Sequence, residues 1–185
     1  MASRQVVIEG IGRGLLMNNP SSMFAPRELA KGKRSTDKPT AEEDAAKSAY
    51  WTPDHSSLAF PAMNLWAGMK AASKGYKSPV NKKLALSPLI AGDVEVLPDM
   101  IPFGTADYQI DVRRAVVQRA GIPRARAWLP SWRLKFTVNW EAQFLGEGDG
   151  WLQENLEVLG TRVGIGDFRP QRGGPFGRFR VVTIE

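Results

Sequence analysis

A segment near the C-terminus, residues 160–180, combines arginine, glycine and phenylalanine in the sequence GTRVGIGDFRPQRGGPFGRFR. Arginine presents a planar fork of donors to phosphate, and glycine lets the backbone approach a phosphate closely. A phenylalanine ring can stack on a base for about 1–3 kcal/mol. The segment is therefore expected to bind nucleic acid through Arg162, Gly164, Gly166, Phe168, Arg169, Arg172, Gly173, Gly174, Phe176 and Arg178.

The same pattern has a second interpretation. A glycine-rich loop that only joins a helix to a strand would place Phe168 and Phe176 in the core. A Walker-type nucleotide site is not supported, because that motif needs a lysine after its last glycine and residues 160–180 contain none.

The centre of the chain carries another concentration of positive charge. Residues 112–135 contain seven basic residues and no acidic one. Residues 120–123, Ala-Gly-Ile-Pro, separate two strand-like arms, 107–117 and 124–129, and predict a hairpin with a basic surface. Its candidate phosphate-binding side chains are Arg113, Arg114, Arg119, Arg124 and Arg126, and Arg13 near the first strand joins them. The alternative is an edge hairpin that carries charge to avoid aggregation.

The composition of the 185-residue chain narrows the classes of partner and site. A net charge of +6 suits a polyanion. With no cysteine and one histidine, a metal site is not expected, and no cofactor is predicted. No apolar run approaches the ~20 residues of a transmembrane helix, and the start lacks a signal segment, so a cytoplasmic protein that does not enter a membrane is expected.

Hydrophobic periodicity predicts the elements that position these residues. Residues 18–50 are read as an insertion that is flexible or partly helical, because their first part is polar. Within it, Thr40 and Glu43 form a capping box for a helix over 41–50. Six segments form the predicted core, in the order strand, helix, strand, strand, helix, strand: residues 4–17, 60–73, 84–97, 132–140, 150–160 and 179–184.

This order predicts an α+β fold of the ferredoxin-like or RRM-like type, a βαββαβ sandwich. Its antiparallel sheet would carry two helices on one face and leave the other face free for ligands. Residues 1–185 are read as a single domain. The basic hairpin would form a thumb-like insertion over residues 98–130, between the second and third strands.

Four separated places in the chain resemble the RAMP superfamily, the RRM-like proteins that form the backbone and the processing nuclease of CRISPR effector complexes. They are the first strand with its turn, the start of the first helix, the basic hairpin and the glycine-rich loop. Pro61-Ala62-Met63-Asn64 stands where the superfamily has a Pro-Gly-Ser-Ser-like turn. Only one RRM-like half is present, which is similar to small standalone members of the kind expected in phages or mobile elements acting in a bacterial cell.

The resemblance implies a non-enzymatic protein that binds single-stranded RNA or DNA and multimerises along the strand, in a larger ribonucleoprotein. It also implies an alternative, a metal-independent endoribonuclease with His55 as general acid or base. A third interpretation is a structural or inhibitory subunit of a protein assembly. Tryptophans such as Trp66 and Trp128 are either core residues or anchors for self-association.

Overall fold

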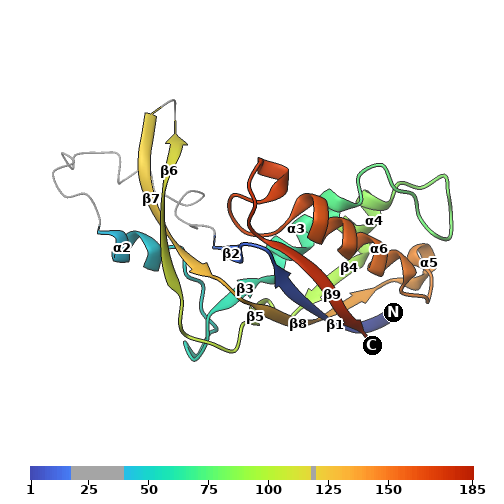
Figure 1. The fold of residues 1–185 in the computed structure, drawn as a ribbon. Coiled ribbons are helices and arrows are strands. Elements are labelled where there is room, and N and C mark those ends of the chain that lie inside the picture. Colours follow the sequence, from blue (N-terminus) through green and yellow to red (C-terminus); the bar gives the residue numbers. More distant parts are fainter. Residues whose placement is uncertain (18–39, 118–119) are drawn as a thin grey trace, which may run out of the picture.

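The computed structural model describes residues 1–17, 40–117 and 120–185, without the side chains of 114–117 and 120–122. It is an α+β structure, as predicted, and its sheets are antiparallel. Because residues 18–39 and 118–119 are not described, the predicted polar loop lies mostly outside the described residues, as does Arg119. Figure 1 shows the main sheet with helices packed on one side and a long hairpin projecting from the sheet.

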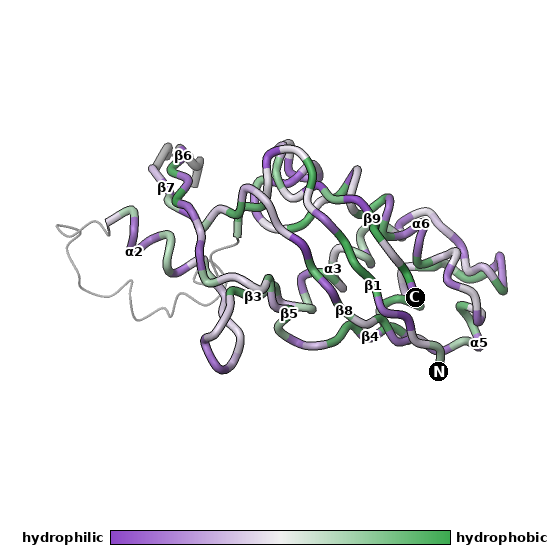
Figure 2. Tube along the Cα trace, turned by 60° about the horizontal axis from the view of Figure 1, so that its bottom comes forward, coloured by the Kyte–Doolittle hydropathy of each residue, from purple (hydrophilic) through white to green (hydrophobic). Residues whose placement is uncertain are grey.

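The main sheet has four strands in the order β4-β8-β1-β9. The strands are β1 (Ala2–Ile11), β4 (Val94–Leu97), β8 (Arg133–Trp140) and β9 (Arg178–Ile184). Strand β8 confirms the predicted alternation, since Leu134, Phe136, Val138 and Trp140 are buried and the residues between them are not. Figure 2 shows this alternation of hydrophobic and hydrophilic residues along β8. One face of the sheet is thus buried and the other is in contact with solvent.

Two helices cover the buried face: α3 (Ala62–Ala72) and α6 (Gly150–Val158). The expected helix end at Gly160 is wrong, because α6 continues directly into a π-helical turn, Leu159–Val163. Gly160 is instead required by packing, since a Cβ at this position would overlap the carbonyl oxygen of Phe179 on β9. Helix α6 thereby lies tightly against the sheet.

The predicted second strand, residues 84–97, is only partly correct. Residues Leu86–Asp93 form helix α4, and only Val94–Leu97 form strand β4. Leu86 and Ile90 are buried four residues apart, so this apolar run packs with helical spacing. A short apolar run does not by itself distinguish a buried helix from a buried strand, which explains the error.

A second sheet carries the basic hairpin. It consists of β2 (Leu15–Leu16), β7 (Ala120–Leu129) and β6 (Gln109–Val117), in that order. The hairpin is confirmed, but its turn is not at residues 120–123. Val117 pairs with Ala120, so residues 120–123 belong to β7. A two-stranded ribbon of β3 (Ala59–Pro61) and β5 (Met100–Pro102) completes the strands of the described residues.

Helix α2 (Ala41–Ala46) confirms the predicted capping box. The Thr40 hydroxyl accepts a hydrogen bond from the Glu43 backbone, and the Glu43 carboxylate accepts one from the Thr40 backbone. The helix lies beside β7, where Asp44 and Ser48 accept hydrogen bonds from the backbone N–H groups of Ala125 and Ala127. Side chains of the helical segment thus satisfy an edge of β7 that would otherwise be unpaired.

Candidate nucleic-acid interface

The arginine-bearing side of the hairpin is directed at the glycine-rich loop, residues 164–177. In the hairpin register Arg113 is opposite Arg124, and Asp111 is opposite Arg126. Arg126 is buried, and its Nε lies 2.5 Å from the Asp167 carboxylate in the loop. The structure therefore brings these two predicted segments together. Arg126 itself serves this contact and is not available to a ligand, contrary to expectation.

Arg113 is also held by protein groups. Its Nε donates to both oxygens of Asp111, at 2.7 and 2.9 Å, and this bond raises the pKa of the guanidinium. Its guanidinium carbon lies 4.8 Å from the ring centre of Phe176 in the loop. Arg124 is half-buried and has no ion pair among the described residues. The hairpin face is therefore less positive than its sequence suggests.

The two aromatic residues of the glycine-rich loop have opposite environments. Phe176 is 1% exposed, so the prediction that it stacks on a base is wrong and its ring belongs to the protein interior. Phe168 is 40% exposed and adopts a φ of 46°, an unfavourable value for a bulky side chain. The loop holds Phe168 in this conformation, since its carbonyl accepts a hydrogen bond from the Phe176 backbone N–H. Phe168 is an exposed ring held in place by its surroundings.

The loop glycines mainly let the chain pack against itself. A Cβ on Gly174 would overlap the carbonyl oxygen of Phe168, and one on Gly166 would overlap that of Leu16. Of the predicted glycines, only Gly173 has open space at its Cβ. Gly164 and Gly166 line a small cavity of about 140 Å³ beside α3, together with Asn64 and Arg169. In this cavity the buried Gly164 and Gly166 border a space that a small ligand group could enter.

The arginines of the C-terminal segment fall into two groups. Arg169 is half-buried and donates to the Gly166 carbonyl at 3.1 Å and to Gln171 at 3.2 Å. Burial lowers the pKa of Arg169, and the nearby positive charge of Arg172 lowers it further. Arg162, Arg172 and Arg178 are exposed and have no ion pair among the described residues.

The helix-free face of the main sheet carries four cations, and the site prediction named only one of them, Arg178. Arg133 and Lys135 on β8 lie on this face, as do Arg178 and Arg180 on β9; we call these four residues the basic face. Their strands flank β1, where Glu9 pairs with Arg133 on one side and with Arg180 on the other. The alternation of charged and buried apolar residues along β8 and at the start of β9 is the sequence signal that could have predicted this face.

Glu9 is the acidic residue within this group. Its carboxylate accepts hydrogen bonds from Arg180 at 2.6 and 3.1 Å, and these bonds lower the pKa of Glu9. Arg133, Lys135 and Arg178 have no ion pair in the described part of the chain. No aromatic side chain of the described residues projects from this face, because the aromatic residues of β8 and β9 are buried.

The predicted Arg13 lies in the turn between β1 and β2. Its side chain is exposed, and its carbonyl accepts a hydrogen bond of 2.9 Å from the Trp128 indole on β7. The backbone of neighbouring Gly14 accepts a hydrogen bond from Gly177, at the end of the glycine-rich loop. The side chain of Arg114, like Arg119, lies outside the described residues. Arg13 therefore lies at the junction of the hairpin, the loop and the main sheet.

His55, the candidate catalytic residue, lies in an exposed loop with a φ of 57°. Its ring stacks on Trp51 at a centroid distance of 6.2 Å. Neighbouring Asp54 accepts hydrogen bonds from Thr52 and Ser56 rather than from His55. Over the described ranges, no group of three or more His, Asp and Glu residues could hold a metal ion.

No known family is matched. A scan against models of protein families and a search of curated proteins both find no significant match for this chain. None of the helices described is long and apolar enough to cross a membrane.

Proposed function

We propose that this protein binds single-stranded RNA or DNA without catalysing a reaction, and that the phosphate backbone follows the basic face. The observation that carries the proposal is the arrangement of Arg133, Lys135 and Arg178, three exposed cations that form no ion pair with the described residues. No helix of the described residues covers this face, so a chain of phosphates has room to approach. Such contacts are strong at low salt because they release counterions from the nucleic acid.

The preference for a single strand rests on Phe168. An exposed aromatic ring can stack on an unpaired base, whereas the bases of a duplex already stack on each other. Arg172 is exposed in the same loop and adds a cation for the adjacent phosphate. The small cavity beside Asn64 and Arg169 offers a place for one further phosphate group.

A finer fold assignment belongs to the same proposal. We infer a ferredoxin-like or RRM-like arrangement from the element order β1, α3, β4, β8, α6, β9 and from the sheet order β4-β8-β1-β9. The position of the hairpin between β4 and β8 in the chain supports the proposed likeness to the thumb-like insertion of the RAMP superfamily. Membership in that superfamily, and assembly along a nucleic-acid strand, are proposals that rest on the resemblance of the four segments.

Fluorescence anisotropy with labelled 20-nucleotide strands tests the function. We expect saturable binding of single-stranded RNA or DNA at micromolar protein, weaker binding of the matching duplex, and a logarithm of affinity that falls linearly with the logarithm of salt concentration. Incubation of the bound RNA in chelator should leave it intact. Absence of binding at 50 mM salt would refute the proposal, and cleavage that His55→Ala abolishes would favour the ribonuclease alternative.

A further inference from the structure

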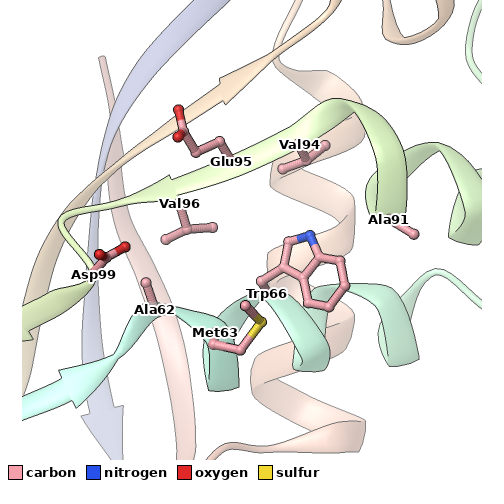
Figure 3. A pocket seen from close by; sticks show the side chains of 8 residues that line it. All are labelled: Ala62, Met63, Trp66, Ala91, Val94, Glu95, Val96 and Asp99. Atoms are coloured by element: carbon pink, nitrogen blue, oxygen red, sulfur yellow. The ribbon is translucent and has the colours of Figure 1, made fainter.

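A groove runs between helix α3 and strand β4, at the edge of the sheet farthest from β9. It has a volume of about 500 Å³ and is lined by Ala62, Met63, Trp66, Ala91, Val94, Glu95, Val96 and Asp99. Figure 3 shows Met63 and Trp66 on the helix side of this space and the β4 residues above them. Met63 is 67% exposed, and the Trp66 indole donates to the Ile90 carbonyl at 3.1 Å, which fixes the ring at the groove wall.

Strand β4 is an open edge of the sheet. It is last in the order β4-β8-β1-β9 and pairs with β8 on one side only. Apart from β8, no described segment makes a backbone hydrogen bond with residues 94–97. An added strand beside β4 would lie over α3 and cover Met63 and Trp66. The groove therefore has the position and the apolar floor of a fifth strand.

The rim of the groove is acidic, although the whole chain has a net charge of +6. Glu95 and Asp99 line the groove itself, and Asp93 and Glu141 line an adjoining hollow of about 260 Å³. The cations Arg178 and Arg180 lie on β9, at the opposite edge of the sheet. The carboxylates of this rim repel phosphate, so the charge of the groove favours a basic occupant over nucleic acid.

We infer that this groove binds an extended segment of a partner protein in which basic and apolar residues alternate. The segment adds to β4 as a strand, its apolar side chains cover Met63 and Trp66, and its Lys or Arg side chains pair with Glu95 and Asp99. This inference does not depend on the proposed nucleic-acid binding, which uses the basic face.

Charge also decides against symmetric pairing with a second copy of this chain. Two β4 strands side by side would bring the Glu95 and Asp99 carboxylates of both copies to one seam, and like charges there are destabilising. The other edge, β9, is approached by the π-helical turn, because Gly160 packs directly on the carbonyl oxygen of Phe179. A strand from another protein that carries basic residues and binds at β4 avoids both the repulsion between carboxylates and the π-helical turn beside β9.

The test uses six-residue peptides that alternate lysine with valine, leucine or phenylalanine, and matched peptides with glutamate in place of lysine. Binding is followed by the backbone amide signals of residues 94–97 and the Trp66 indole signal in NMR spectra of the full chain. We expect saturable shifts with the lysine peptides and none with the glutamate peptides. Alternate N-methylation of the peptide backbone should abolish the shifts, since it removes the strand hydrogen bonds.

Two variants and one control separate the contributions to this binding. Met63→Gln should weaken the lysine peptides about tenfold, which corresponds to ~1.4 kcal/mol of lost apolar contact. Glu95→Lys should transfer the preference to the glutamate peptides. Glu154→Lys, an exposed charge change on α6, should leave binding unchanged.

Three outcomes would overturn the inference. They are the absence of saturable shifts for every lysine peptide at millimolar concentration, equal binding of N-methylated and unmodified peptides, and a concentration-dependent dimer that Met63→Gln abolishes. The dimer would identify a second copy as the occupant. Nucleic-acid affinity, measured in parallel by anisotropy, should be unaffected by Met63→Gln, so failure of one proposal is distinguishable from failure of the other.

Discussion

Arg126 Nε lies 2.5 Å from Asp167 Oδ2, and this ion pair joins strand β7 of the hairpin to the glycine-rich loop. The Arg126 side chain is 11% exposed and that of Asp167 36% exposed, so solvent reaches the pair mainly from the carboxylate side. An isolated bridge between Leu16 and Asp167 reinforces the same junction. These contacts join the two basic segments of the sequence beside the main sheet.

Asp167→Asn should lower the free energy of unfolding by about 1–2 kcal/mol. The substitution leaves the guanidinium of Arg126 buried without a countercharge, and partial solvent access keeps the loss below that of a fully buried pair. Urea denaturation measures the change. The control is Glu9→Gln, which removes the exposed pair with Arg180 and should cost clearly less, because solvent screens that pair. Equal losses for the two variants would contradict the structural role of the Arg126 pair.

Gly177→Ala should destabilise the protein by about 2 kcal/mol or more, whereas Gly173→Ala should cost only about 1–2 kcal/mol. Both glycines have a φ near 70–76°, which penalises any Cβ. At Gly177 the new methyl group would also overlap the carbonyl oxygen of Ile165, while at Gly173 it meets nothing within 4 Å. Thermal unfolding of the two variants separates backbone strain from collision. A larger loss at Gly173 would show that this packing of the loop is wrong.

Exchange of Arg133, Lys135 and Arg178 for glutamine should weaken single-strand binding at least about tenfold and reduce the slope of log affinity against log salt by roughly 2. The slope falls because each phosphate contact contributes to counterion release. The matched control exchanges three exposed lysines that lie outside the basic face: Lys74, Lys82 and Lys83. If the control lowers the slope as much as the first variant, binding follows net charge and not this face.

Phe168→Leu should weaken single-strand binding by about 1–3 kcal/mol, because it removes a ring that stacks on a base. The free energy of unfolding should fall by only about 1 kcal/mol, since leucine suffers the same backbone strain and the main loss is the contact between the Phe168 and Phe176 rings, whose centres lie 6.2 Å apart. Phe168→Tyr retains a ring and should bind as the wild type does. Anisotropy titrations against one oligonucleotide compare the three proteins. Unchanged affinity in Phe168→Leu would remove the stacking role.

The loop around His55 should lose order as the pH falls from about 4 toward 2. A hydrogen bond from the Thr52 hydroxyl, with further bonds from Ser56, lowers the pKa of Asp54 from 3.8 to about 2. The folded loop favours the ionised form of Asp54. Its stabilising effect on the loop is therefore fully present above the pKa of Asp54 in the unfolded chain, and it is lost as the pH falls through the pKa of Asp54 in the folded chain. Carboxyl carbon NMR signals of Asp54 should titrate near pH 2. A midpoint near 3.8 would contradict this network, and Asp54→Asn should make the loop insensitive to pH in this range.

Local patterns in the sequence were sufficient for many elements of the fold. The strict alternation of residues 133–140 predicts β8, because a half-buried strand needs an apolar residue at every second position. Thr40 and Glu43 predict the start of α2, since both hydrogen bonds of the capping box lie within four residues. The α+β class and the existence of the hairpin followed from the same local signals.

The sequence by itself therefore determined where positive charge and glycine are concentrated, and the tertiary structure decided which of those residues face solvent. Arg126 is engaged by Asp167, and Phe176 is buried, through contacts between segments far apart in the chain that residue types in one segment do not encode. The basic face arises only when β8 and β9 come to lie on either side of β1. The burial of Phe176 and the pairing of Arg126 depend on partners far apart in the chain, so only the tertiary structure decides them. Helix capping and strand alternation depend on neighbouring residues, so the sequence alone predicts them.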